Sequence, residues 1–95
     1  MRSYEMMLIN RPDLDDAGNQ AVLDRISGIV TNTGGAIEKM EPSKKQRLAY
    51  EINDFRDGIY TIVYFKGEPK TAEELNRVLK ITDGVIRFMI VRPEE

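Results

Sequence analysis

The chain has 95 residues and a formal net charge of −2, from 14 basic against 16 acidic side chains, and it contains neither histidine nor cysteine. Apolar residues make up 41% of it, which is enough for one small core and predicts a single domain over residues 1–95. The missing residue types exclude disulfides, thiolate metal sites, thiol nucleophiles and the usual general base near neutral pH. An enzyme of this composition would have to use carboxylates, lysine, tyrosine or a bound cofactor. We expect no catalytic residue, no metal site and no cofactor, and the lack of cysteine fits a reducing, cytoplasmic location.

No segment of the sequence is typical of a membrane protein. The apolar run near the N-terminus, "MMLI", has four residues and is too short for a secretion signal. No apolar stretch is long enough to cross a bilayer. We expect no membrane association.

The first third of the chain predicts a strand followed by a helix. Residues 3–10 are short, apolar-rich and followed by Pro12, as in a strand. Asp15 or Asp16 can cap a helix that Gly34-Gly35 ends. The helix presents apolar residues at three- and four-residue spacing, namely Val22, Leu23, Ile26, Ile29 and Val30.

The middle of the chain predicts two strands joined by a hairpin. Residues 36–40 form a strand that can continue, past an irregularity near Pro42, through residues 48–52. Asp57-Gly58 is a hairpin signal, and residues 59–65, "IYTIVYF", are β-branched or aromatic throughout.

The last third predicts a second helix and a final strand. Residues 71–74, "TAEE", have the pattern of a capping box. Asp83-Gly84 ends the helix, residues 85–91 form the final strand, and Pro93 closes it. The apolar side of the helix consists of Ala72, Leu75, Val78 and Leu79.

This order of elements, β-α-β-β-α-β, predicts the α+β ferredoxin-like fold, a four-stranded antiparallel sheet with both helices on one face. The other face should meet water, and its strands should then alternate apolar and polar residues. Three strands instead carry apolar residues on both sides, which predicts a large exposed apolar patch covered by another polypeptide. The expected partner-protein face is Met7, Ile9, Tyr60, Ile62, Tyr64, Met89 and Val91.

Basic residues gather in a chain that is acidic as a whole. Residues 39–47, "KMEPSKKQR", carry four positive charges and one negative. Arg2 opens the first strand and Arg92 follows the last, and since these strands are antiparallel neighbours we expect both at one edge, with Arg87 on the same final strand. These residues are either solvated surface charge or contacts to RNA phosphates, and with so few of them RNA binding by this chain alone should be weak and salt-sensitive.

The open face does not match an RNA-recognition motif of the same topology. That module needs a basic or glycine-aromatic signature on the third strand, with aromatic residues projecting outward. Here the segment reads "DGIYTIVYF", with an acidic leading position. Base stacking on this face is therefore not favoured.

Several segments resemble one family in order along the chain: "MRSYEMMLINRPDL", "GGAIEKME", "RLAYEI", "DGIYTIVYF" and "ELNRVLKITDGVIRFMIV". Over nearly its whole length the chain resembles the bacterial small ribosomal subunit protein S-six (S6) family. The resemblance implies a ribosomal protein of the ferredoxin-like fold. It also implies pairing with ribosomal protein S-eighteen (S18) as a heterodimer, and joint binding of the pair to the central domain of small-subunit ribosomal RNA.

The resemblance also implies positions for the RNA contacts. Arg2 and Tyr4 match the opening motif of the family, Arg47 matches the basic residue before "LAY", and Arg87 and Arg92 match basic positions of the final strand. Where the family often has a glycine and further basic residues before "LAY", this chain has Lys44, Lys45 and Gln46, and Glu51 replaces a common proline. The expected RNA-binding residues are Arg2, Tyr4, Lys44, Lys45, Arg47, Arg87 and Arg92.

Two other classes of protein fit the same fold. A homodimeric ferredoxin-like enzyme or ligand-binding protein could enclose a small molecule between two sheets, and the open face permits it. The missing histidine and the lack of convergent polar residues on that face argue against a small-molecule substrate. A phosphate-binding hydrolase would need an anion-binding loop after the first strand, where residues 10–16, "NRPDLDD", are acidic.

Overall fold

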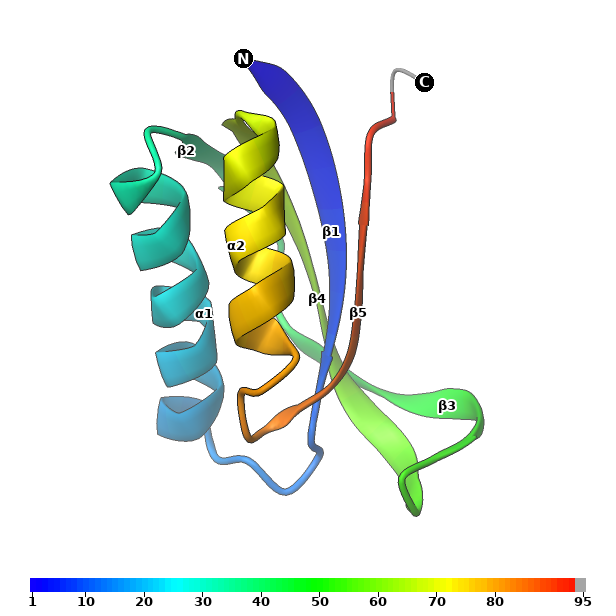
Figure 1. Ribbon diagram of the computed structural model, residues 1–95. Helices are drawn as coiled ribbons and strands as arrows, with labels where there is room; N and C mark the ends of the chain where they lie inside the picture. Colours follow the sequence, from blue (N-terminus) through cyan, green and yellow to red (C-terminus); the bar gives the residue numbers. More distant parts are fainter. Residues whose placement is uncertain (94–95) are drawn as a thin grey trace.

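The computed structural model describes residues 1–93 and consists of one sheet with two helices packed on it (Figure 1). In chain order the elements are β1 (Arg2–Asn10), α1 (Asp16–Asn32), β2 (Ala36–Met40), β3 (Lys44–Ile52), β4 (Phe55–Gly67), α2 (Pro69–Leu79) and β5 (Val85–Val91).

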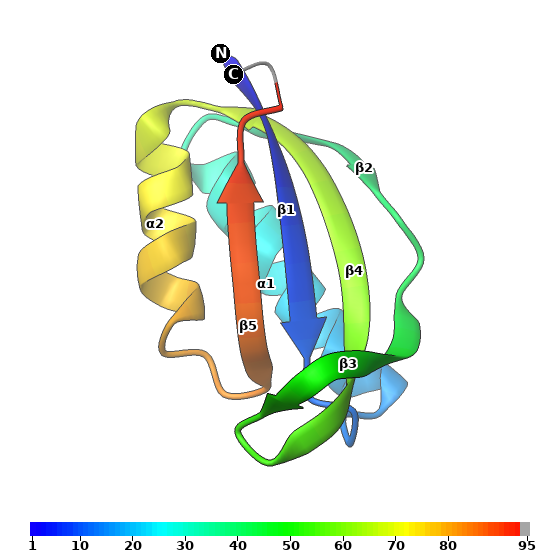
Figure 2. The ribbon, with the colours of Figure 1, turned by 90° about the vertical axis from the view of Figure 1, so that its right-hand side faces the viewer.

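The sheet is antiparallel in the order β2-β4-β1-β5, and β3 pairs with β4 outside this path. Both helices lie on the same face, so the ferredoxin-like prediction is confirmed (Figures 1 and 2). The sheet has five strands rather than four because the second predicted strand breaks at residues 41–43. Its two parts, β2 and β3, pair with successive stretches of the same edge of β4.

The core lies between the helices and the sheet. One face of β1 and of β4 meets the inner faces of α1 and α2, where the Tyr4 and Phe65 rings stack with centroids 5.2 Å apart. The two helices are joined by the hydroxyls of Thr33 and Thr71, 2.8 Å apart. The predicted apolar faces of both helices are buried here, in agreement with their spacing; the central residues are Met6, Leu8, Ile26, Val30, Val63, Leu75 and Leu79.

The hairpin between β3 and β4 turns at a different place from the one predicted. Asn53 and Asp54 have positive φ angles of 51° and 68°, as in a two-residue turn between antiparallel strands. Asp57-Gly58, the predicted hairpin signal, lies inside β4 instead. Gly58 is needed there because a Cβ at this position would overlap the side chain of Ile9.

The first helix has the expected cap and the second does not. Asp15 accepts a hydrogen bond of 2.7 Å from the Gly18 amide and caps α1. The capping box predicted at "TAEE" was wrong. The helix α2 already begins at Pro69, whose fixed φ suits the first helical position. Thr71 and Glu74 then lie within the helix, where Thr71 bonds Thr33 and Glu74 bonds Arg77.

The two helices are 17 and 11 residues long. Within residues 1–93, neither helix is long and apolar enough to cross a membrane.

Candidate functional site

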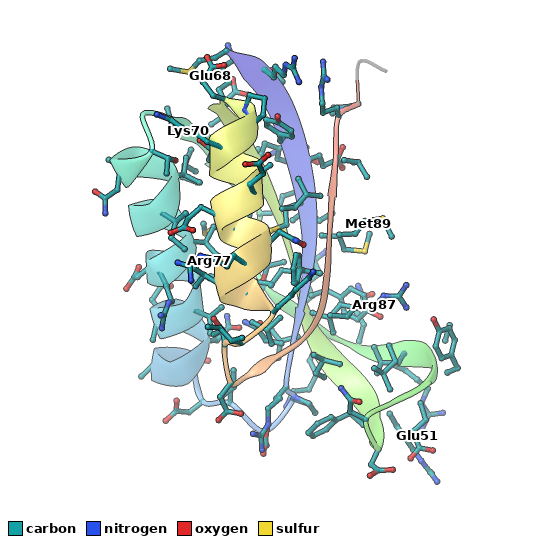
Figure 3. All side chains as sticks on the ribbon, viewed as in Figure 1. Glu51, Glu68, Lys70, Arg77, Arg87 and Met89 are labelled. Atoms are coloured by element: carbon teal, nitrogen blue, oxygen red, sulfur yellow. The ribbon has the colours of Figure 1, made fainter. Side chains whose placement is uncertain are left out.

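Three rows of side chains cross the face of the sheet that the helices leave open. Strand pairing sets these rows, since directly opposed residues on neighbouring strands point to the same side. Figure 3 shows Arg87 and Met89 projecting from β5 away from the helices. From β5 through β1 to β4, the rows are Val91–Glu5–Tyr64, Met89–Met7–Ile62 and Arg87–Ile9–Tyr60.

The predicted partner-protein face therefore gathers on one surface. Met7, Met89 and Val91 are 45%, 51% and 42% exposed. Tyr60, Ile62 and Tyr64 are half-buried by their neighbours. These six residues form what we call the open face, an apolar surface of side chains that neither helix covers.

Ile9 is an exception among the seven predicted residues. It is only 7% exposed, because β3 and the first half of β4 lean over the end of the open face (Figure 1). Leu48 of β3 is buried in the same region, and Gly58 lies directly against Ile9. Ile9 is thus part of a small second core and is not available to a partner.

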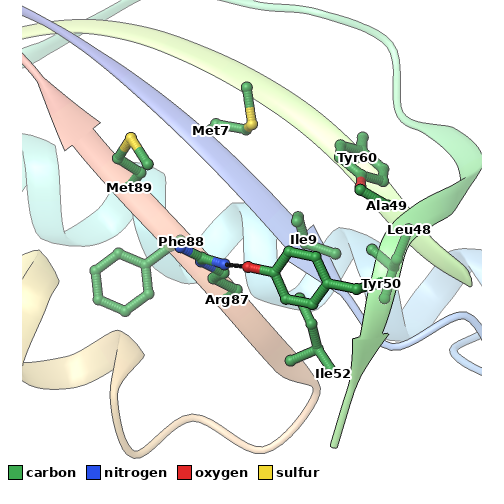
Figure 4. Close-up of a pocket in the computed structure, with 10 residues that line it drawn as sticks. All are labelled: Met7, Ile9, Leu48, Ala49, Tyr50, Ile52, Tyr60, Arg87, Phe88 and Met89. Carbon is green, nitrogen blue, oxygen red and sulfur yellow. Dashed lines mark hydrogen bonds between the residues drawn. The ribbon is translucent and has the colours of Figure 1, made fainter. Parts of the chain in front are cut away.

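A groove of about 260 Å³ runs between β3 and the open face (Figure 4). Its outer wall consists of residues on one side of β3 that were not predicted as site residues, namely Leu48, Tyr50 and Ile52. The alternation of "LAYEI" is the signal that could have identified these residues. The Arg87 guanidinium donates a hydrogen bond of 2.6 Å to the Tyr50 hydroxyl and joins the two walls.

Charge is distributed unevenly around the open face. Glu5 lies in the row of Tyr64, and Glu41 accepts a long hydrogen bond of 3.5 Å from the Tyr64 hydroxyl. Partial burial of the phenol, together with the nearby Glu5 and Glu41 carboxylates, raises the pKa of Tyr64. Glu5 and Glu41 therefore place carboxylates at the end of the face near β2, where Lys39 lies 3.8 Å from Glu41 and offsets part of the negative charge. Arg87 provides positive charge at the other end.

The basic residues of β3 divide between its two sides. Lys44 is opposite Tyr60 and faces the open side of the sheet, whereas Lys45 and Arg47 are opposite Ile59 and Asp57 and face the other way. All three are exposed. Consecutive residues of a strand point to opposite sides, so these cations do not form one patch.

Acidic groups lie close to Lys45 and Arg47, the two basic residues of β3 that point away from the open side. Asp57 is opposite Arg47 in the strand pairing. The Arg11 guanidinium, which donates to the Asp13 carboxylate at 2.9 Å, lowers the pKa of Asp13, and Lys45 adds a smaller attraction. The acidic loop after β1 therefore lies near the basic strand.

The remaining predicted RNA contacts lie at other places. Arg2 and Arg92 are at the end of the sheet where the two termini meet (Figure 2), and Arg92 is half-buried. Arg87 lies on the open side near β3. Tyr4, only 6% exposed, is stacked on Phe65 in the core, so its ring is not at the surface for RNA to contact.

Within residues 1–93, no three acidic side chains come together in an arrangement that could hold a metal ion. The features that remain are an uncovered apolar sheet face and basic side chains at both ends of the sheet. The protein is therefore of the ferredoxin-like class, with one face of its sheet left uncovered by the helices.

The family model of ribosomal protein S6 matches residues 3–92, and the chain belongs to this family. It is 61% identical over the full length of both chains to small ribosomal subunit protein bS6 of Symbiobacterium thermophilum. It is 45% identical, again over both full lengths, to bS6 of Desulfitobacterium hafniense strain DCB-2. The family consists of structural ribosomal proteins, so the chain is not an enzyme and the rival enzyme interpretations fail.

The fold agrees with a solved structure of the same family. The crystal structure of 30S ribosomal protein S6 from Thermotoga maritima superimposes with a TM-score of 0.89 at 30% identity, covering 96% of this chain and 86% of that one. A protein of the small ribosomal subunit acts in the cytoplasm, as part of the ribosome.

Proposed function

We propose that this chain forms a heterodimer with ribosomal protein S18 through the open face, and that the pair binds the central domain of small-subunit ribosomal RNA. The observation that supports this most is the exposure of Met7, Met89 and Val91 in a continuous surface with two tyrosines. Tyrosine and methionine are enriched in protein interfaces, and burying such a surface is favourable.

The charges favour a basic partner. The chain has a net charge of −2, and Glu5 and Glu41 border the open face at its β2 end. A basic protein would be attracted to this border and would supply the positive charge that RNA binding needs. The chain by itself then binds RNA weakly, and the heterodimer binds it strongly.

The proposed RNA contacts form two groups. One group is Lys44, Lys45 and Arg47 with Arg87 nearby, and the other is Arg2 with Arg92. The nine residues of β1 separate the two ends of the sheet by about 26 Å at the usual rise of a strand. RNA that contacts both groups therefore has to extend along the sheet, and Tyr4 takes no direct part.

Light scattering of the chain alone and with S18, followed by titration of each sample with a central-domain RNA fragment, tests this function. We expect a monomer alone, a one-to-one heterodimer with S18, and tight RNA binding only by the heterodimer. A tight homodimer that binds neither S18 nor RNA would contradict the proposal. Strong RNA binding by the chain alone would contradict the role given to the partner.

A further inference from the structure

A chain of polar side chains lies directly before the basic strand. Asn10 at the end of β1 donates a hydrogen bond of 2.8 Å to the Asn19 side chain in the first turn of α1. Asn19 donates one of 3.0 Å to the Ser43 hydroxyl, which lies 2.6 Å from the hydroxyl of Thr61 in β4. We call these four residues the polar chain.

The polar chain is buried at both ends, at Asn10 and Thr61, and reaches the surface in its middle, at Ser43. Asn10 and Thr61 are 0% and 1% exposed, whereas Ser43 is exposed. Buried polar groups of this kind are costly to leave without partners, so the contact with Ser43 is under strong constraint. The Asn10 Oδ1 has no hydrogen-bond partner among residues 1–93, and the Asn10 side chain joins the polar chain through its Nδ2 bond to Asn19.

The polar chain lies beside the interruption between β2 and β3. Between β2 and β3, residues 41–43 leave the ladder, and the Glu41 amide bonds the Ile62 carbonyl there at 2.9 Å. Ser43 then bonds Thr61 immediately before β3 resumes pairing at Lys44. The hydroxyl contact therefore lies at the point on β4 where β3 begins.

The register of β3 decides where its cations point. A shift by one residue would turn Lys44 away from the open side and bring Lys45 and Arg47 onto it. We propose that Ser43 and Asn19 are positioning residues, which fix this register and so direct Lys44 and Lys45 to their two sides. The consequence for RNA affinity rests on the proposed function, whereas the effect on register does not.

Nuclear magnetic resonance of the free protein tests the effect on register. In Ser43→Ala we expect amide exchange of residues 44–47 to rise about tenfold, as for the loss of one hydrogen bond, and Lys44–Tyr60 cross-strand signals to weaken. Asn19→Ala should have the same two effects on β3. Its global stability should stay close to that of the parent, because alanine favours the helix. Ser43→Thr keeps the hydroxyl and should restore both signals.

A serine of α1 supplies the control. Ser27→Ala removes a hydroxyl two helical turns beyond Asn19 and should leave β3 exchange unchanged. Unchanged exchange and unchanged cross-strand signals in both Ser43→Ala and Asn19→Ala would overturn the proposal, whatever RNA binding shows.

RNA titration of the heterodimer separates this inference from the proposed function. We expect Ser43→Ala to weaken RNA binding by about twofold to threefold, less than removal of the β3 cations, and Ser43→Thr to restore it. If removing the β3 cations weakens binding but Ser43→Ala does not, the positioning role is wrong. If removing those cations has no effect, the RNA contact proposed for β3 fails, while the exchange measurement still decides the effect on register.

Discussion

The two faces of this sheet contain similar residues in opposite situations. Met6 and Met7 are neighbours with identical side chains, yet Met6 is 0% exposed and Met7 is 45% exposed. Strand alternation sends one toward the helices and the other toward the open side. Apolar composition thus does not decide burial here, and the presence of a covering layer does.

This difference has an energetic consequence. Fully burying a side chain of this size gains about 1.5–3 kcal/mol, which the helix-covered face has already gained in the folded monomer. On the open face much of that free energy is still available when a partner binds. The two faces should therefore respond differently to the same substitution, one in stability and the other in association.

The matched pair Met6→Ala and Met7→Ala should give the largest contrast. We expect Met6→Ala to lower the free energy of unfolding by about 2–5 kcal/mol, since it leaves a cavity in the core, whereas Met7→Ala stays within about 0.5 kcal/mol of the parent. Urea unfolding monitored by circular dichroism measures both. Similar losses in the two variants would mean that the open face is covered in the isolated protein.

Ile9→Ala tests the part of the open side that β3 covers. We expect a loss of about 2 kcal/mol, because Ile9 is buried under the leaning β3–β4 hairpin although it shares the side of Met7. The same unfolding experiment measures it. A loss as small as that of Met7→Ala would show that the hairpin does not hold this position in solution.

Met89→Asp should break association without unfolding the protein. A charge in the middle row of the open face would be buried by the partner, so we expect S18 affinity to fall by at least about tenfold in calorimetric titration. Ile81→Asp is the matched control, because Ile81 is an apolar residue with 76% exposure outside the open face. Equal effects of the two changes would locate the partner elsewhere.

Removing the β3 cations should have a smaller effect, confined to RNA. For Lys44→Ala combined with Lys45→Ala and Arg47→Ala, we expect RNA affinity of the heterodimer to fall by about threefold to tenfold. The dependence on salt should also weaken, since fewer phosphates are neutralised, while S18 affinity stays the same.

The control for charge is a triple variant in the helix layer. Arg25→Ala, Lys70→Ala and Lys80→Ala remove the same net charge from α1, α2 and the residue after α2. An equal loss of RNA affinity in this control would mean that only overall charge matters.

The smallest effect is expected on the solvent side of the helices. Arg77 donates a hydrogen bond of 2.7 Å to Glu74, which lowers the pKa of Glu74 below its ordinary 4.5. The stability from this pair is present above pH 4.5 and is lost as the pH falls through the lowered pKa. Glu74→Gln should therefore be slightly less stable than the parent at pH 7, and the difference should vanish in acid. A difference that persists in acid would contradict this explanation.

The order of the elements follows from local sequence pattern, because the helical spacing of α1 and the Asp15 cap are properties of neighbouring residues. Strand alternation assigned the residues of each strand to two sides, and the apolar residues on both sides of β1, β4 and β5 predicted an uncovered apolar face. For the same reason six of the seven predicted partner-face residues lie on the exposed surface, and the basic residues of β3 were identified as candidates.

The remaining features of the fold and of the site depend on contacts that form only when the chain folds. The positions of the hairpin turn and of the start of α2, the burial of Tyr4 against Phe65 and the cover over Ile9 all depend on segments that meet only after folding. The groove with its Tyr50–Arg87 hydrogen bond and the polar chain before β3 likewise join residues far apart in the sequence. Alternation fixes which side a residue faces, but the elements that pack against that side decide whether it becomes core or interface.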